Sequence, residues 1–365
     1  MDSITQATLG ALCGEVILGR KLGNKAVLWG ALFGTLPDLD IIAYPFLSFA
    51  EQLMWHRGFS HSILMTFIAT FFFGWLMHRK YAESGLSFKR LSFFIFLAWG
   101  THILIDCFNT YGTQIMEPFS HDRFSINNIS IMDPFFTVPL IIGLIAMAFM
   151  NRLSPKRIKI GWIVTGWLCV YFSLSLIVKY VAGNEFEQRL ADNNITYNKM
   201  MTAPSFGNIF LWRMVARDDE HFYVSYWSIF DGKSDTDKIN KFKQGHELDE
   251  QFKDSEDFQT MIWFAQGWHK TYQLPNEPNS IYIVAVNMSE IGIERDDGVT
   301  ELRPAFVWKV TNTDNGYEAE RPFKLSKDGG SHIWKALGSL IDRIPGETDE
   351  WMSGTWTWDL EEKHQ

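Results

Sequence analysis

Residues 59–77 read FSHSILMTFIATFFFGWLM and contain no Lys, Arg, Asp or Glu side chain. Coiled as an α-helix, a segment of this length extends about 28 Å, close to the roughly 30 Å thickness of a bilayer's hydrocarbon core. Three later segments are similarly apolar: 91–105, 135–150 and 160–180. The sequence therefore predicts four membrane helices, whose differences in length tilt can accommodate.

Two glycine-rich apolar segments precede these helices, over residues 4–18 and 26–43. They are shorter, or are interrupted by Pro37, Asp38 and Asp40, so we predict short spans or re-entrant segments. The first 15 residues contain no Lys or Arg, unlike the basic leader of a cleaved signal peptide. We therefore expect the N-terminus to be retained.

The second half of the chain has a different character. Residues 1–183 carry a net charge of +4, whereas residues 184–365 carry −13. Short aromatic and β-branched runs predict strands at 210–215, 222–230, 260–264, 281–286 and 305–310. We thus predict an α-helical polytopic membrane domain over 1–183, followed by an acidic, β-rich soluble domain over 184–365.

Charge and cysteine content exclude several classes of protein. The acidic second half and the absence of a Lys/Arg stripe argue against a nucleic-acid surface. The three cysteines, Cys13, Cys107 and Cys169, lie in apolar segments, so disulfide or redox chemistry is not expected. The oligomeric state cannot be inferred from these features.

Basic loops predict the orientation in the membrane, because Lys and Arg are enriched in cytoplasmic loops. The residues concerned are Arg20, Lys21 and Lys25 in the first loop, Arg79, Lys80, Lys89 and Arg90 in the second, and Arg152, Lys156, Arg157 and Lys159 in the third. With these loops in the cytoplasm, everything after Gly183 is predicted to lie outside it. If the segments 4–18 and 26–43 together crossed the membrane an odd number of times, this assignment would be reversed.

Two motifs before the helix at 59–77 could bind a cation. Pro37-Asp38-Leu39-Asp40 places two carboxylates two residues apart, and in an extended backbone both would lie on one side. His56-Arg57-Gly58-Phe59-Ser60-His61-Ser62 offers two imidazoles suited to zinc and a guanidinium suited to a phosphate oxygen. The alternative for the first motif is a polar helix end. The alternative for the second is a set of interfacial residues in which Arg57 contacts lipid headgroups.

A third motif lies within a membrane helix, where ionisable groups are costly and usually functional. His102 and Asp106 are spaced i, i+4 and therefore share one helical face. They could both bind a metal, or Asp106 could orient a metal-binding His102. A structural His–Asp pair that joins helices is the alternative.

The loop after this helix adds further candidates. His121 and Arg123 could contribute to a site or simply be solvated loop residues, and Asp133 could be a ligand or the N-cap of the helix begun by Pro134. The predicted topology places all the candidate groups towards the same outer face: Asp2, Asp38, Asp40, His56, His61, His102, Asp106, His121 and Asp133. This convergence favours a single site.

Several motifs together resemble one family. They are Met1-Asp2-Ser3-Ile4-Thr5-Gln6-Ala7, Pro37-Asp38-Leu39-Asp40, the segment from His56 to Ser62, His102-x3-Asp106, Thr110-Tyr111-Gly112-Thr113 and Asp133-Pro134. In combination they look like the YdjM-type inner-membrane metal-dependent hydrolases, over roughly the first half of the chain. That family is grouped with zinc-dependent phospholipase C and a single-strand nuclease of the same helical fold, whose His and Asp ligands hold several zinc ions. The resemblance implies phosphoester hydrolysis in a bacterial inner membrane and names no substrate.

The expected function is therefore a membrane-bound, metal-dependent hydrolase acting on an anionic phosphoester, with a lipid or lipid-linked substrate preferred to a soluble one. The expected metal ligands are His56, His61, His102, Asp106, Asp38, Asp40, Asp133 and His121. Arg57 would orient the substrate and Asp38 would also act in catalysis. One to three divalent ions are expected, Zn²⁺ first, with Mn²⁺ or Fe²⁺ also compatible. An ion-coupled transporter and a non-catalytic membrane anchor for a binding domain are the alternatives.

Overall fold

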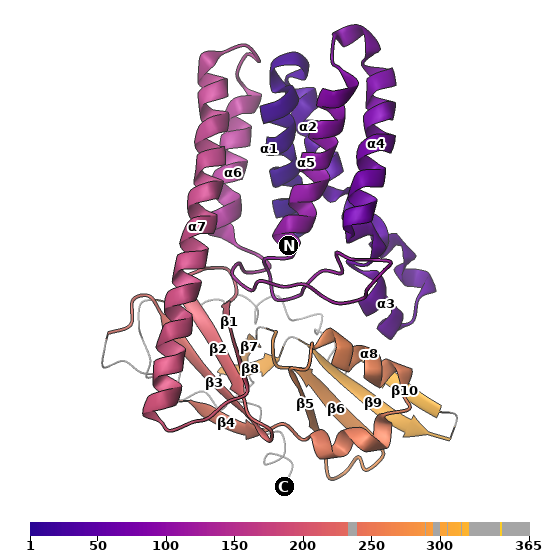
Figure 1. Cartoon of the computed structure of the whole chain (residues 1–365), viewed down its shortest axis with the longest axis vertical. Helices are drawn as coiled ribbons and strands as arrows, with labels where there is room; N and C mark the ends of the chain where they lie inside the picture. The colour runs from indigo at the N-terminus through magenta and orange to yellow at the C-terminus, as the bar shows by residue number, and fades with distance from the viewer. Residues whose placement is uncertain are drawn as a thin grey trace. The chain divides into compact units, whose positions relative to one another are not determined.

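The computed structural model describes residues 1–232, 239–288, 290–294, 300–304, 306–314 and 316–320, together with Ile344 (Figure 1). The chain separates into two compact units. The first comprises Met1–Leu47 and Met54–Leu176, and the second comprises Ser48–Leu53 and Ile177–Gln365.

The first unit is helical, as predicted. Its long helices stand side by side, and the N-terminus and the loop after α5 lie at the same end of them (Figure 1). The helices are α1 (Ser3–Leu22), α2 (Asn24–Thr35), η1 (Leu36–Phe46), α3 (Phe49–Trp55), η2 (Phe59–His61), α4 (Ile63–Lys80), η3 (Ala82–Ser84), α5 (Phe88–Asp106), α6 (Pro134–Ala148) and α7 (Pro155–Asp192), with α3 and α7 shared between the units.

Three of these segments are long and apolar enough to cross a membrane: Asn24–Phe46, Phe88–Asp106 and Pro155–Asp192. A fourth, Phe49–His61 with Ile63–Lys80, qualifies if its two parts, bent by 53°, form one span. Helix α6 is apolar but has only 15 residues. The membrane character is thus confirmed, whereas the predicted count of four helices plus two short segments stays a prediction.

Glycines bring α1 and α2 into close backbone contact. A β-carbon on Gly10 would lie 2.3 Å from the Gly30 carbonyl oxygen, and one on Gly14 would lie 2.1 Å from that of Ala26. No side chain larger than hydrogen fits at such separations, and small residues are the usual means of close helix packing in membranes. This contact continues to Gly34, where a β-carbon would lie 2.6 Å from the Gln6 carbonyl oxygen.

Pro37 ends α2, as expected, but the backbone that follows is not extended. Residues Leu36–Phe46 form the 3₁₀ helix η1. The prediction that Asp38 and Asp40 share one side was therefore wrong in its geometry. Because a 3₁₀ helix turns about 120° per residue, side chains two apart point in different directions, and these two aspartates face different nitrogens of His61.

Helix α7 continues beyond the domain boundary predicted at residue 183. It ends at Asp192. Phe186 and Leu190 in this extension are fully buried against Met214 and Tyr223 of the second unit, to which this part of the helix belongs. The apolar side chains of the extension were too widely spaced to resemble a membrane span.

The second unit contains three antiparallel sheets among its described residues, in agreement with the predicted β-rich domain. The sheet orders are β1-β2-β3-β4, β10-β9-β6-β5 and β7-β8. The strands are β1 (Lys199–Pro204), β2 (Leu211–Arg217), β3 (His221–Ser228), β4 (Asn240–Lys243), β5 (His269–Tyr272), β6 (Ser280–Ala285), β7 (Glu290–Glu294), β8 (Thr300–Pro304), β9 (Val307–Thr313) and β10 (Gly316–Glu320). The helical segments η4 (His246–Phe252) and α8 (Glu256–Phe264) connect β4 to β5.

One predicted strand was wrong. Residues 260–264 belong to helix α8, whose N-cap Ser255 accepts a hydrogen bond from the backbone N–H of Phe258. Phe258, Met261 and Phe264 recur every three residues on its buried face. The short apolar run at 260–264 resembled a strand because only part of this helical period falls within it.

Candidate metal centre

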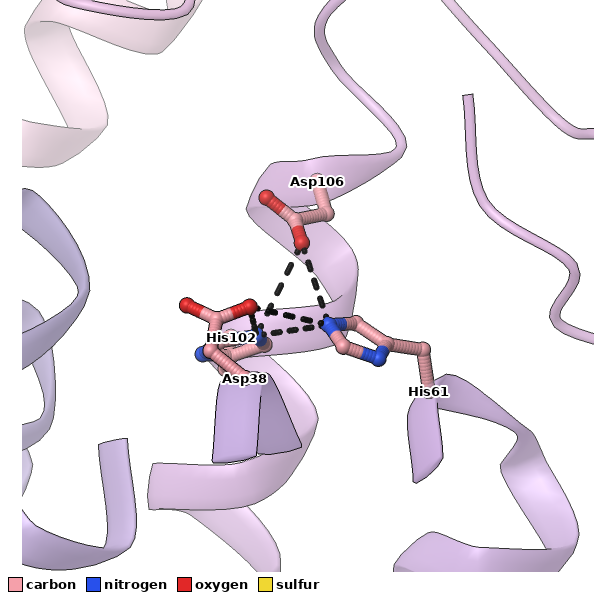
Figure 2. A group of neighbouring side chains, drawn as sticks. All are labelled: Asp38, His61, His102 and Asp106. Atoms are coloured by element: carbon pink, nitrogen blue, oxygen red, sulfur yellow. Dashed lines mark hydrogen bonds and ion pairs between the residues drawn. The ribbon is translucent and has the colours of Figure 1, made fainter. Parts of the chain in front are cut away.

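Four side chains from three elements of the first unit converge on one point. Asp38 lies on η1, His61 at the end of η2, and His102 and Asp106 one turn apart on α5. Figure 2 shows the two imidazoles and two carboxylates directed towards one another. Each contributes one donor atom, and all four atoms lie within 4.8 Å of one another.

The separations between these donor atoms are close to those of metal ligands. The Nε2 atoms of His61 and His102 are 3.0 Å apart. Asp38 Oδ1 lies 3.3 Å from His61 Nε2 and 3.4 Å from His102 Nε2, while Asp106 Oδ2 lies 3.5 Å and 3.6 Å from the same atoms. Tetrahedral zinc with bonds of about 2.0–2.1 Å separates its ligands by about 3.3–3.4 Å.

The hydrogen-bond partners of the two imidazoles determine where their protons lie. His102 Nδ1 is 2.7 Å from the Gly34 carbonyl oxygen, which can only accept, so this nitrogen carries the proton. The Ser60 hydroxyl donates to Asp40 and therefore accepts from His61 Nδ1 at 2.8 Å. In the neutral imidazoles both Nε2 atoms are thus left with lone pairs, which face each other and the two carboxylates.

Asp106 is fully buried, and its two oxygens have different environments. Oδ1 accepts hydrogen bonds from the Met1 α-amino group and from Gln6 Nε2 and lies 3.2 Å from Arg57 Nη2. Oδ2 faces the two imidazoles and accepts no hydrogen bond from any residue that the structure describes. A buried carboxylate oxygen without a donor is costly, and a cation at the centre of the four atoms would satisfy it.

Asp40 lies beside this group and supports it. Its carboxylate accepts from His56 Nδ1 at 3.0 Å, from the Arg57 backbone N–H at 3.1 Å and from the Ser60 hydroxyl at 3.1 Å. Through Ser60 it orients His61, as carboxylates and hydroxyls commonly do for metal-binding imidazoles. Asp40 and His56 were predicted as ligands, but neither belongs to the four-atom group.

Arg57 is buried and already bound by protein groups. Its guanidinium donates to Asn109 Oδ1 at 3.0 Å, pairs with Asp106 and lies 4.6 Å from the centre of the Tyr111 ring. Its backbone has φ of +60°, a conformation that is strained for a residue with a side chain and is tolerated where surrounding contacts impose it. These contacts make Arg57 a positioning residue for Asp106, while its predicted role in orienting substrate stays a prediction.

The structure does not bring Asp133 or His121 to the group. Asp133 is the N-cap of α6, accepting from the Phe136 N–H at 3.2 Å and from the Tyr171 hydroxyl at 2.6 Å. The side chain of His121 is 61% exposed and pairs with Glu117. Asp133 is therefore a helix N-cap and His121 an exposed loop residue, which are the alternatives to metal binding that the sequence offered.

Access to the group is from the side of Asp38. The side chains of His61, His102 and Asp106 are fully buried, whereas that of Asp38 is 16% exposed. The neighbouring residues of η1 are apolar and exposed, with Ile41 at 48% and Ile42 at 66%. The least buried of the four donors thus lies on a helix that also exposes apolar side chains.

Sequence reasoning missed several residues of this centre. The Met1 amino group, Gln6, Ser60 and Asn109 all hold Asp106, His61 or Arg57 in place. Gln6 was a detectable candidate, because it is a polar residue four positions before Gly10 on the glycine-lined face of α1. Met1 and Asn109 contact residues far away in the chain, whereas Ser60 contacts its neighbour His61 and the more distant Asp40.

Fold and site define a class: an α-helical membrane protein with a buried group of two histidines and two aspartates that could hold a metal ion. The comparisons with known proteins agree. The family model described as "YdjM inner membrane protein" matches residues 1–185, and the chain belongs to this family.

Two known proteins are similar to part of the chain in sequence. The chain is 30% identical over 145 residues to the uncharacterized protein YfhP of Bacillus subtilis strain 168, covering 38% of this chain and 43% of YfhP. It is 30% identical over 127 residues to the inner membrane protein YbcI of Escherichia coli strain K12, covering 33% of this chain and 69% of YbcI. The match thus spans less than half of YfhP. No solved structure matches the chain.

Proposed function

We propose that the chain is a membrane-bound, metal-dependent hydrolase that cleaves a phosphoester at the outer face of the inner membrane. One observation carries this proposal: two imidazole nitrogens, which bear lone pairs when the rings are neutral, and two carboxylate oxygens meet in a buried space. Four such donors repel one another unless a cation lies among them. Two nitrogen and two oxygen donors suit zinc, and manganese(II) or iron(II) also accept them.

The chemistry follows from the residues present. A divalent ion held here would lower the pKa of a bound water and neutralise charge on a phosphoryl oxygen. Asp38, as the exposed donor, is the residue nearest to an incoming substrate and is proposed to contact the reacting water. Arg57, Gln6 and Asn109 keep Asp106 and its neighbours in place during the reaction.

A lipid or lipid-linked phosphoester is the proposed substrate class. The exposed apolar residues of η1 beside Asp38 support it, because a lipid could approach along them by lateral diffusion. The basic loops predict that this end of the unit lies on the outer side of the membrane. A lipid headgroup at the outer leaflet would then reach the group without crossing the bilayer.

The transporter alternative is less well supported. Ion-coupled transport needs ionisable groups that continue through the membrane and can exchange their ions or protons. Glu15, the acidic residue nearest to the inner side of α1, is bound at both oxygens by Arg157, at 2.7 Å and 2.6 Å. A carboxylate held in this way is a structural group and a poor relay.

The test compares Asp106→Asn with the wild type. We expect the variant to insert normally into the membrane, to bind about one equivalent less metal than the wild type by elemental mass spectrometry, and to lose hydrolysis of phospholipid and of a chromogenic phosphodiester. Asp122→Asn is the matched control, since Asp122 is an exposed loop aspartate bonded to Ser120. Full hydrolytic activity in Asp106→Asn would exclude the proposal.

A further inference from the structure

A second group of histidine and aspartate side chains lies in the other unit, outside the proposed hydrolase centre. His246 and Asp249 lie on η4, and His269 lies on β5. One donor atom from each lies within 4.8 Å of the other two. The residues of η4 are spaced i, i+3, which places them on one face of a 3₁₀ helix.

The backbone is shaped to bring η4 against β5. Gly245, which precedes η4, has φ of +75°, and a β-carbon there would lie 1.9 Å from the Thr271 carbonyl oxygen. The Thr271 N–H also donates to the Gln244 carbonyl at 2.8 Å. Only glycine allows this approach, so the close packing of the two segments is encoded at this position.

Asp249 is held by two residues from the same face of β5. Its Oδ1 accepts from the Thr271 hydroxyl at 2.7 Å, and its Oδ2 lies 2.9 Å from His269 Nε2. This separation is an ordinary hydrogen-bond distance and is shorter than the roughly 3.3–3.4 Å between two ligands of a tetrahedral zinc ion, so the two atoms would move slightly apart on binding an ion. The side chain of His269 is 8% exposed and that of Asp249 is 21% exposed, so the group is near the surface yet ordered by packing.

His246 donates one imidazole N–H to the backbone and stacks on His269, with ring centroids 4.2 Å apart and 19° between the ring planes. For both to bind one ion together, one of these two rings would turn out of the stack. The Nε2 atom of His246 is 2.8 Å from the His269 carbonyl oxygen. Because a carbonyl can only accept, Nε2 carries the proton and Nδ1 carries the lone pair. An imidazole that donates one N–H to a backbone carbonyl and presents its other nitrogen is a common arrangement at zinc sites.

We propose that His246, Asp249 and His269 form a second divalent metal site of the zinc class. Two imidazoles and one carboxylate favour zinc over calcium or magnesium, which prefer oxygen ligands. With three protein donors in the described part of this unit, a tetrahedral ion would take water as its fourth ligand. The ion would fasten η4 to β5, the outermost strand of its sheet, and thereby cover an edge that could otherwise pair with another chain.

The competing explanation is a hydrogen-bonded cluster that fastens η4 to β5 without an ion. Metal content separates the two. The full chain, purified in detergent, is loaded with Zn²⁺, desalted and measured by elemental mass spectrometry. We expect His246→Gln and Asp249→Asn each to lose about one equivalent of zinc per chain relative to the wild type.

His221→Gln is the matched control, because His221 is a partly exposed histidine of the same unit that faces Asp218 at 3.7 Å. It should retain all of the zinc. Substitution by Co²⁺ provides a second readout, since a tetrahedral site has visible absorption bands that the His246→Gln variant should lose. Unchanged zinc content and unchanged Co²⁺ absorption in both His246→Gln and Asp249→Asn would overturn the proposal.

Measuring zinc content in the Asp106→Asn variant, with and without His246→Gln, distinguishes metal bound at this site from metal bound at the hydrolase centre. If both sites exist, Asp106→Asn retains about one equivalent and the double variant with His246→Gln retains none. If the hydrolase centre binds no metal, Asp106→Asn matches the wild type while His246→Gln still loses its equivalent. The two proposals can therefore fail independently.

Discussion

The Nε2 atoms of His61 and His102 lie 3.0 Å apart, although both imidazoles carry their proton on Nδ1. While both imidazoles are neutral, neither Nε2 atom can donate to the other. Their lone pairs repel unless a cation lies between them and the adjoining carboxylates. This relationship is the strongest indication that the helical unit binds a metal ion.

The first prediction concerns His102. His102→Ala removes one of four donors and should lower bound transition metal by about one equivalent per chain relative to the wild type, as measured by elemental mass spectrometry on detergent-purified protein. His78→Ala is the control, since His78 lies in the last turn of α4 and faces Phe88. Equal metal content in the two variants would contradict a metal centre at His102.

Ser60 should matter for affinity rather than for the presence of the site. Ser60→Ala removes the hydroxyl that links Asp40 to His61, and loss of such outer partners weakens metal binding about 10- to 100-fold. Competition with a chelator of known affinity would measure the change. Ser173→Ala, which removes a hydroxyl bonded only locally to the Cys169 carbonyl, should leave the affinity unchanged.

The contact between α1 and α2 should depend on Gly34. In Gly34→Ala the new methyl group would lie 2.6 Å from the Gln6 carbonyl oxygen, forcing the helices apart at a cost of about 1–3 kcal/mol. It should also weaken metal binding, because the Gly34 carbonyl orients His102. Thermal unfolding in detergent tests the first effect, and metal titration tests the second.

Gly166→Ala is the matched control for Gly34→Ala. A β-carbon at this position on α7 would have nothing within 4 Å. The substitution should change stability by no more than about 1 kcal/mol, in the stabilising direction. Equal destabilisation by the two variants would show that close packing at Gly34 is unimportant.

The buried pair of Glu15 and Arg157 should be structural. Glu15→Gln or Arg157→Met alone leaves an unpaired buried charge or acceptor and should cost about 3–5 kcal/mol, whereas the double variant should recover most of this loss. A double-mutant cycle of thermal unfolding measures the coupling. Hydrolysis should survive in the folded double variant, while abolished uptake of a solute or ion would instead favour a transporter.

The orientation can be tested independently of metal. A reporter active only outside the cytoplasm, fused after Gln365, should be active, because the basic loops predict an outer C-terminal domain. A reporter active only in the cytoplasm, fused at the same position, should be silent. The opposite pattern would move the whole site to the inner side of the membrane.

Much of the fold could be read from the sequence because it depends on local composition. Uninterrupted apolar segments such as 59–77 and 91–105 identify helices of the membrane unit, and β-branched runs such as 281–286 identify strands. The failures were also local. The run at 260–264 was too short to distinguish a strand from the end of α8, and α7 extended past the boundary drawn from hydropathy alone.

The candidate centre was only partly predictable. The spacing of His102 and Asp106 on one helix requires them to share a face, and both belong to the four-atom group. Asp38 and Asp40 looked equivalent in sequence, yet only Asp38 lies close to the Nε2 atoms of both His61 and His102, because η1 turns the two aspartates apart. Asp40 instead faces the Nδ1 atoms of His56 and His61. Asp133 and His121 shared the residue types of ligands and have other partners.

The sequence by itself determined that this is a membrane protein with a β-rich acidic domain, and that it carries histidines and aspartates with the spacing of metal ligands. Hydropathy, charge and helical periodicity are properties of neighbouring residues, so no tertiary contact is needed to recognise them. Only the tertiary structure decided which donors meet. The meeting of Asp38, His61, His102 and Asp106 depends on glycine contacts between helices and on partners such as Gln6, which lies 100 residues from Asp106 in the chain.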